Sequence, residues 1–238
     1  MTDRKTAAAI VLAAGESRRY AGESGVNKTL EPLLGQPVLL YSVRAFDRHP
    51  LVDRILVAAR PGQTAAVREI LDGADLSTPW QVLPGGADRR GSVLACLAAC
   101  TEDYVIIQDG ARPLLRERYI TETLGALAEV PGASVAVPAS DTVKLAGKDR
   151  MVLSTLPRAQ TWLVQTPQAF RREVLLRAHA ALDDPAAATD DCVALERIGE
   201  PVRLIPGDTD NRKLTFPEDR ELLALALQSF SQEAASTP

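Results

Sequence analysis

Short apolar runs alternate with amphipathic segments along most of this chain, and this alternation constrains the fold more than any other feature. The run 7–14 is apolar throughout, and 103–109 has an apolar centre at 104–107. Segments with helical periodicity lie between such runs. Strands that are apolar on both sides occur in parallel sheets with helices on both faces. The sequence therefore predicts an α/β fold with a Rossmann-like, mostly parallel sheet flanked by helices.

The same periodicity gives the order of the expected elements. Strands are expected at 7–14, 53–59, 80–84, 103–109, 133–139 and 201–207. Helices are expected at 37–49, 63–71, 89–100, 117–130, 190–199 and about 217–230. Residues 231–238 are expected to form a loose tail.

The pattern changes after Pro138. Residues 139–160 contain short β-prone pieces around Gly147 and no amphipathic helix, which predicts a protruding β-hairpin arm. Because a hairpin alone is marginally stable, we expect it to pack on something, and a second copy of this chain is the simplest candidate. We expect one domain over 1–238, with this arm inside it and no second catalytic module after Leu227.

Composition narrows the possible partners. The formal net charge of −4 disfavours general nucleic-acid binding, and the aromatic content of 4% disfavours a stacking platform for single strands. Apolar runs stay far below the roughly 20 residues that cross a bilayer. We therefore expect a cytoplasmic protein without nucleic-acid or membrane partners. The three cysteines have no metal-binding spacing and are expected to be unpaired and buried.

Three polar stretches follow predicted strands, at 15–28, 85–92 and 109–113. Ligands of parallel sheets bind beyond the carboxyl ends of strands, so these stretches are expected at one edge. The first stretch is not a P-loop, because no glycine directly precedes Lys28. Nor is it a dinucleotide fingerprint, because Gly15 lacks the two further glycines. Two interpretations remain: a solvated surface loop, or a nucleoside triphosphate held by backbone N–H groups and by cations.

Eight motifs resemble, in order, those of the 2-C-methyl-D-erythritol 4-phosphate cytidylyltransferases, from about Ala8 to Leu227. They are LAAGESRRY, NKTLEPLLGQP, GGADRRGSV, QDGARP, DTVK, QTPQAF, TDD and DNRKLT. The first loop alone marks only the wider class of sugar nucleotidyltransferases, whereas QDGARP together with TPQ and DNRKLT is more specific.

The resemblance implies transfer of CMP from CTP to 2-C-methyl-D-erythritol 4-phosphate. The products would be 4-diphosphocytidyl-2-C-methyl-D-erythritol and pyrophosphate, in non-mevalonate isoprenoid synthesis. The attacking phosphate oxygen is already ionised near neutral pH, so no histidine base is required. Positioning and charge stabilisation around the α-phosphorus suffice.

The resemblance also implies the site residues. Catalytic roles fall on four cations: Arg19, Lys28, Arg158 and Lys213. Binding roles fall on Ala14, Gly15, Gly86, Ser92, Asp109, Arg112, Thr142 and Thr166. Asp109 is the implied ligand of Mg²⁺, which prefers oxygen donors. Thr142 and Arg158 lie in the arm, so the resemblance further implies a homodimer in which Arg158 serves the partner's site.

Some positions depart from the family pattern. Ser17 stands where the family usually has glycine, so the backbone there is expected to approach a phosphate less freely. The interval from Arg19 to Lys28 is about two residues longer than usual, and Ala87 replaces a residue that is often acidic. Asp190 and Asp191 are expected to begin the 190–199 helix, at its positive end.

Two alternatives to the implied function stay open. A ribitol-5-phosphate cytidylyltransferase would share much of the motif pattern and would differ in how the arm fits the polyol. A non-catalytic nucleotide-binding homologue would keep the sheet and bind CTP without releasing pyrophosphate.

Overall fold

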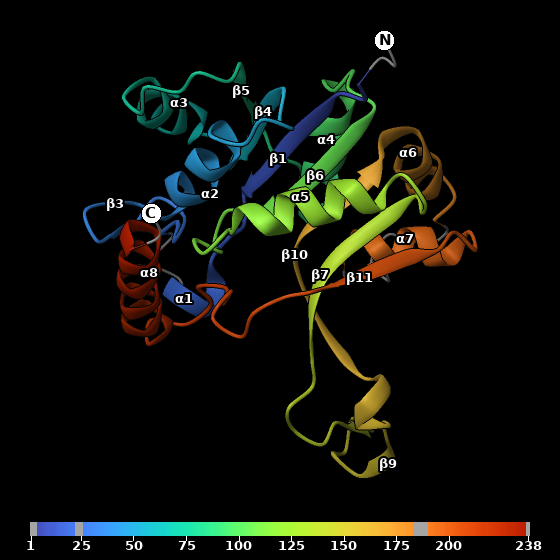
Figure 1. Ribbon diagram of the computed structural model, residues 1–238. Helices are drawn as coiled ribbons and strands as arrows, with labels where there is room; N and C mark the ends of the chain where they lie inside the picture. Colours follow the sequence, from blue (N-terminus) through green and yellow to red (C-terminus); the bar gives the residue numbers. More distant parts are fainter. Residues whose placement is uncertain (1–3, 22–25, 183–189, 237–238) are drawn as a thin grey trace.

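A central sheet organises the chain (Figure 1). The computed structural model describes residues 4–21, 26–182 and 190–236. Within them, seven strands form one sheet in the order β11-β7-β10-β6-β1-β4-β5. Their bounds are β1 Ala7–Ala13, β4 Arg54–Ala59, β5 Trp80–Pro84, β6 Tyr104–Asp109, β7 Gly132–Pro138, β10 Trp162–Arg171 and β11 Val202–Pro206.

Helices cover both faces of this sheet. One face packs against α2 (Val38–Asp47), α3 (Thr64–Asp72) and α5 (Glu117–Ala126). The other face packs against α4 (Arg89–Ala98), α6 (Arg172–Ala180) and α7 (Asp191–Arg197). In β1, Ala9 and Val11 join the first core, and Ala8 and Ile10 join the second, because successive side chains point to opposite faces. The predicted fold class is confirmed.

Strand β10 runs antiparallel to both of its neighbours, β6 and β7. Sequence periodicity did not predict this strand, because its apolar run is broken by Gln165, Pro167 and Gln168. All three lie in the strand, whose pairing with β7 shifts register between Val164 and Gln168. The two glutamines are nonetheless buried, and their amides donate to Asp208, Ser134 and Asp190. Hydrogen bonding therefore replaces apolar character at these core positions.

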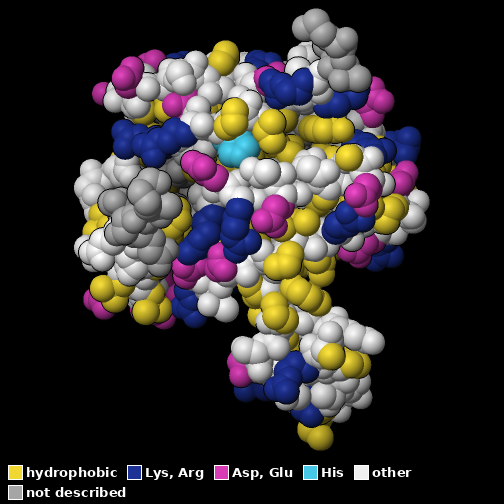
Figure 2. Space-filling view, in the orientation of Figure 1, with side chains coloured by type: hydrophobic (Ala, Val, Ile, Leu, Met, Phe, Trp, Pro, Cys, Tyr) yellow, Lys and Arg dark blue, Asp and Glu magenta, His cyan; other side chains and the backbone are white. Residues whose placement is uncertain are grey.

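The predicted arm is present and extends away from the body (Figure 1). It consists of β8 (Lys144–Ala146), β9 (Val152–Thr155) and a 3₁₀ turn, η1 (Arg158–Gln160). Strands β8 and β9 pair only with each other in the described part of the chain. Hydrophobic side chains gather at the base and the tip of the arm in Figure 2, and the exposed ones are Leu145, Met151, Val152, Leu153, Trp162, Leu163 and Val164. Dimerisation through this arm stays a prediction.

The C-terminal helix α8 (Asp219–Ser236) packs beside the small strands β2 (Pro32–Leu33) and β3 (Gln36–Pro37). Leu223 and Leu227 of α8 share a third apolar cluster with Leu33. The expected loose tail was wrong as far as Ser236, because good helix formers such as Gln232 continue the helix. Residues 237 and 238 lie outside the described residues.

Two further expectations from the sequence concern membrane-spanning helices and the state of the cysteines. No helix within the described residues has the length and apolar character that a membrane span requires. The three cysteines, Cys96, Cys100 and Cys192, are free and buried, as predicted. Burial raises the pKa of the Cys96 thiol to about 12, so this group stays protonated.

Candidate active site

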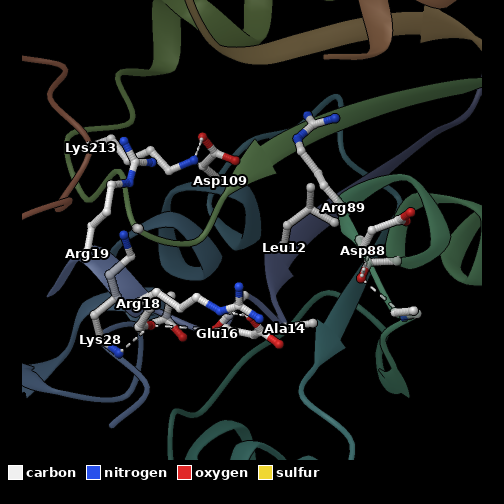
Figure 3. Close-up of a pocket in the computed structure, with 17 residues that line it drawn as sticks. Leu12, Ala14, Glu16, Arg18, Arg19, Lys28, Asp88, Arg89, Asp109 and Lys213 are labelled. Carbon is white, nitrogen blue, oxygen red and sulfur yellow. Dashed lines mark hydrogen bonds and ion pairs between the residues drawn. The ribbon is translucent and has the colours of Figure 1, made fainter. Parts of the chain in front are cut away.

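The carboxyl ends of β1, β5 and β6 open into a pocket of about 380 Å³ (Figure 3). The predicted residues that line it are Ala14, Gly15, Arg19, Lys28, Gly86, Ser92, Asp109 and Lys213. All three polar stretches that follow these strands contribute to its wall. The parallel pairing of β1 with β4 and β6 explains this convergence, because it places the strand ends side by side.

The loop after β1 is held by its own hydrogen bonds. The carbonyl of Gly15 accepts a hydrogen bond of 2.7 Å from Nη2 of Arg60. Ser17 has a φ of +60°, the left-handed conformation that glycine adopts most readily. Its hydroxyl accepts a hydrogen bond of 3.2 Å from the backbone N–H of Lys28. Ser17 thus keeps a glycine-like backbone while its side chain ties together the two ends of the loop.

Asn27 anchors the end of this loop from inside the protein. Its side chain is buried, and its amide donates to the carbonyl of Ala13 at 3.0 Å and to Gln63 at 2.9 Å. Its carbonyl oxygen accepts from the backbone N–H and the hydroxyl of Thr29. The backbone at Lys28 is therefore fixed on both sides. Residues 22–25, which include part of the longer Arg19–Lys28 interval, lie outside the described residues.

The turn after β5 is tightly packed against the pocket. A Cβ atom at Gly85 would lie 2.4 Å from Cβ of Ala14, and one at Gly86 would lie 2.5 Å from the backbone of Gly91, so both positions require glycine. The hydroxyl of Ser92 donates to the Asp88 carbonyl at 2.9 Å and accepts from the Gly86 N–H at 3.2 Å. Ser92 therefore shapes the turn whose backbone faces the pocket.

Asp109 lies at the end of β6 and is surrounded by cations. Its Oδ2 atom lies 2.8 Å from Nζ of Lys213 and 3.6 Å from Nε of Arg112. Burial alone would raise the pKa of Asp109, but the nearby charges of Lys213, Arg112 and Arg89 outweigh burial and hold this pKa at about 2. The carboxylate is therefore ionised at any physiological pH.

Lys28 faces the same group of charges from the other side of the pocket. Partial burial, together with the positive charges of Lys213 and Arg19, lowers its pKa to about 8. Arg19 itself is exposed in the short helix α1 (Arg18–Ala21), with its guanidinium 6.0 Å from the ring centre of Phe216. Among the residues that line this pocket, positive charge exceeds negative charge, and this excess favours an anionic ligand.

A second pocket, of about 300 Å³, adjoins the first. It contains the predicted residues Arg112 and Thr166. The two pockets share three residues, which are Arg89, Asp109 and Lys213. The hydroxyl of Thr166 accepts a hydrogen bond of 3.1 Å from the backbone N–H of Asp109, so β10 and β6 are joined at this point. Two ligands could therefore meet beside Asp109 and Lys213.

The loop that carries Lys213 is braced by a buried asparagine. Asn211 is fully buried, and its amide donates to Gln165 at 2.9 Å and to the Thr166 carbonyl at 3.0 Å. Its own carbonyl accepts from Arg112 at 2.7 Å. Asn211 is not among the site residues that the resemblance implies, although its place inside the DNRKLT motif was the available signal. Arg89, in the GGADRRGSV motif, is likewise absent from the implied site residues, although it lines both pockets.

Two predicted site residues lie elsewhere. Thr142 and Arg158 are exposed in the arm and line neither pocket. Within this one chain, the arm is therefore separate from the two pockets. Their predicted roles require a second subunit, and they stay predictions.

The residues present can be compared with the needs of Mg²⁺. No group of three or more His, Cys, Asp or Glu side chains in the described part of the chain is arranged to hold a metal ion. Asp109 is a single ionised carboxylate that faces both pockets. Mg²⁺ commonly binds through one or two carboxylates, substrate phosphates and water. Asp109 fits that pattern for a metal that arrives with a triphosphate.

Asp190 and Asp191 begin α7 as predicted, but they have different partners. Asp190 is the N-cap, and its carboxylate accepts from the backbone N–H of Val193. Asp191 is buried and pairs with Arg89 at 2.6 Å, and a second oxygen lies 3.1 Å from Nε2 of His179.

Comparison with known proteins places this geometry in a family. The family model of 2-C-methyl-D-erythritol 4-phosphate cytidylyltransferase matches residues 7–229. The enzyme of that name from Symbiobacterium thermophilum is 41% identical over 94% of both chains, and the one from Caldanaerobacter subterraneus is 37% identical over 92% of this chain and 98% of its own.

Solved structures agree with this assignment. The crystal structure of 4-diphosphocytidyl-2C-methyl-D-erythritol synthase from Anaerococcus prevotii superposes with a TM-score of 0.82, at 27% identity, over 94% of this chain and 96% of its own. The crystal structure of the Thermus thermophilus cytidylyltransferase superposes with a TM-score of 0.72, at 28% identity, over 92% and 98%. The chain belongs to the 2-C-methyl-D-erythritol 4-phosphate cytidylyltransferase family.

Proposed function

We propose that this protein transfers CMP from CTP to 2-C-methyl-D-erythritol 4-phosphate and releases pyrophosphate. The observation that carries the proposal is the pair of adjoining pockets that share Arg89, Asp109 and Lys213. A transferase for two phosphorylated substrates needs two such spaces that meet at the reacting phosphorus. The family membership of the chain supports the same assignment.

The larger pocket is the proposed site of CTP. The glycine turn at Gly85 and Gly86 brings backbone groups close to one end, where a cytosine edge is read by hydrogen bonds. Ala14 and Gly15 line the middle of the pocket and would hold the triphosphate. Lys28 and the exposed Arg19, on the loop that follows, would neutralise its charge.

The smaller pocket is the proposed site of the polyol phosphate. Arg112 and Thr166 line it, and Lys213 lies where it joins the nucleotide pocket. An ionised oxygen of the polyol phosphate attacks the α-phosphorus of CTP. The new bond forms as the bond from that phosphorus to the bridging oxygen breaks, and pyrophosphate leaves with the electron pair.

No proton needs to move in this step. The groups on the chain act by holding the two phosphates in line and by neutralising charge as it shifts towards the leaving pyrophosphate. Lys213 orients the attacking phosphate, and Lys28 and Arg19 stabilise the leaving group.

Asp109 is the proposed protein ligand of Mg²⁺, directly or through water. Its carboxylate is ionised and faces both pockets. Bound with the triphosphate, the metal supplies further positive charge to the phosphate oxygens.

The proposal includes a homodimer joined through the arm. Seven large apolar side chains of the arm and its base are exposed, among them Leu153 at 72% and Met151 at 66%. Exposed apolar area of this kind favours an interface. In such a dimer Thr142 and Arg158 would reach the polyol phosphate of the partner subunit.

The direct test is an assay of the purified protein. We expect pyrophosphate release when CTP, Mg²⁺ and 2-C-methyl-D-erythritol 4-phosphate are supplied together. Ribitol 5-phosphate serves as the parallel acceptor, and we expect a much lower kcat/KM with it. Release only with ribitol 5-phosphate would replace the proposed acceptor. Tight CTP binding without release from either acceptor would indicate a non-catalytic homologue.

A further inference from the structure

Arg89 is placed where the two pockets meet. It is the first residue of α4, its side chain is 31% exposed, and it belongs to the walls of both pockets. In Figure 3 its guanidinium lies on the same side of the pocket as Asp109, across from Arg18 and Glu16. Its charge also contributes to the low pKa of Asp109. This position gives Arg89 access to either bound substrate.

The guanidinium of Arg89 has donors to spare. Its Nη1 atom donates to Oδ2 of Asp191 at 2.6 Å. A guanidinium has five N–H groups, and none of the Arg89 nitrogens is among the buried donors that lack a partner in the described part of the chain. Arg89 lines both pockets, so its N–H groups beyond the bond to Asp191 can donate to a phosphate oxygen that is bound there.

Asp191 is built into the core behind this arginine. It is 1% exposed, although its position in α7 is 102 residues away from Arg89 in the sequence. Its second carboxylate oxygen lies 3.1 Å from Nε2 of His179, which is also 1% exposed. A buried carboxylate with both oxygens engaged cannot swing, so it holds Arg89 in one direction.

An arginine at this place needs such a partner. The N-terminus of a helix carries positive partial charge, and Arg112 and Lys213 are nearby cations around Asp109. Burial also opposes the charge of Arg89, and the nearby carboxylates, Asp191 foremost and then Asp109 and Asp190, outweigh burial and raise the pKa of this guanidinium. The ion pair with Asp191 thus keeps the guanidinium of Arg89 at the border between the two pockets.

We propose that Asp191 is a positioning residue: supported by His179, it aims the guanidinium of Arg89 at a substrate phosphate where the two pockets meet. The inference rests on the proposed function, since it is that reaction which brings phosphate groups to this point. The phosphate belongs either to CTP or to the polyol phosphate, and the chemistry of recognition is the same for both.

A double-mutant cycle tests the proposal. We expect Arg89→Gln to lower kcat/KM by about 10- to 100-fold, the range for losing a charge-assisted hydrogen bond. Asp191→Asn should lower it in the same direction. In the Arg89→Gln background, however, Asp191→Asn should have no further effect, because the group through which it acts is gone.

The double-mutant cycle remains informative even if one of the single variants fails to fold. Asp191→Asn alone leaves Arg89 without its buried anion, whereas the double variant is neutral at both positions and needs no ion pair. The comparison of the double variant with Arg89→Gln therefore stands even if Asp191→Asn does not fold. Arg177→Gln is the matched control. It breaks the exposed ion pair between Arg177, which lies on α6, and Glu200, and it is expected to retain wild-type kcat/KM.

The KM values of Arg89→Gln show which substrate's phosphate Arg89 contacts. A rise in the KM for CTP, measured at saturating polyol phosphate, assigns the contact to CTP. A rise in the KM for the polyol phosphate, measured at saturating CTP, assigns the contact to the acceptor. A fall in kcat alone assigns the contact to the transition state.

The proposal is overturned if Arg89→Gln keeps wild-type kinetics, or if Asp191→Asn lowers kcat/KM equally in both backgrounds. Wild-type turnover tests the proposed function separately.

Discussion

The ammonium of Lys213 and the carboxylate of Asp109 form a 2.8 Å ion pair that joins the C-terminal loop to the end of the central strand β6. The pair lies where the two pockets meet, with Asp109 buried and Lys213 about one-third exposed. The ion pair thus aligns Lys213 with the end of β6. Pre-alignment of this kind removes a reorganisation step from the reaction.

Replacing Lys213 with alanine should abolish most of the activity and leave the fold intact. We expect kcat to fall by about 100-fold or more, the usual effect of removing one transition-state stabiliser. Pyrophosphate release measures kcat, and circular dichroism checks the fold. Lys5→Ala, which breaks an exposed pair with Asp103 before β1, is the control and should be fully active. Near-normal turnover of Lys213→Ala would contradict the assigned role.

The low pKa of Lys28 predicts that CTP affinity depends on pH. Its pKa is about 8 instead of 10.5, so the empty protein loses this positive charge as pH rises through about 8. We expect the Kd for CTP, measured by calorimetry, to increase between pH 7 and 9.5. CTP binding near pH 8.5 should also take up protons, because the triphosphate favours charged Lys28.

Arginine at position 28 provides the control. Lys28→Arg stays charged over this range, so its Kd for CTP should be flat with pH. The free energy of unfolding is expected to rise with pH, whereas CTP affinity is expected to fall. Because the unfolded state binds more protons between about 8 and 10.5, Lys28 makes the free energy of unfolding rise with pH there. The pKa assignment fails if the wild type and Lys28→Arg show the same pH profile for CTP.

Mixing two inactive variants should restore activity if the arm acts on the partner subunit. Arg158→Ala and Lys28→Ala homodimers should each be nearly inactive. A mixed dimer has one site with both residues intact, so subunit exchange should restore activity to about a quarter of the wild-type value. Each variant incubated alone is the control. No recovery, with mixed dimers detected by native mass spectrometry, would exclude a role for Arg158 in the partner's site.

Ser17 tests how the loop after β1 is held. Ser17→Ala keeps the left-handed φ but loses the hydroxyl that accepts from Lys28. We expect a several-fold rise in the KM for CTP, since such a bond contributes about 1 kcal/mol. Ser17→Gly should have less effect, because glycine relieves the strain at φ +60° while also losing the hydroxyl. Equal KM values for Ser17→Ala and wild type would show that the hydroxyl does not position Lys28.

Local patterns in the sequence predicted much of the architecture. The alternation of apolar strands with helices predicted a mostly parallel sheet, and the polar stretches after β1, β5 and β6 predicted one edge for the pocket. The break in periodicity after Pro138 predicted the arm. These features can be predicted locally, because the spacing of apolar residues within a segment indicates whether that segment forms a strand or a helix.

Strand β10 shows where local patterns end. Its Gln165 and Gln168 are polar but buried, and their side-chain amides find hydrogen-bond partners on β7, at Asp190 and in the loop that contains Asp208. Residues 231–236 show a different limit: they lack an apolar pattern, yet they continue α8 because they include good helix formers.

By itself, the sequence determined the fold class, the family and most of the residues around the pocket. Only the tertiary structure decided which of those residues meet: Lys213 with Asp109, Ser17 with Lys28, and Asp191 with Arg89 across 102 residues. The physical reason is that such contacts follow from the order and direction in which distant strands pair. Periodicity within a segment carries the direction of its side chains, but it does not carry the identity of the segment packed beside it.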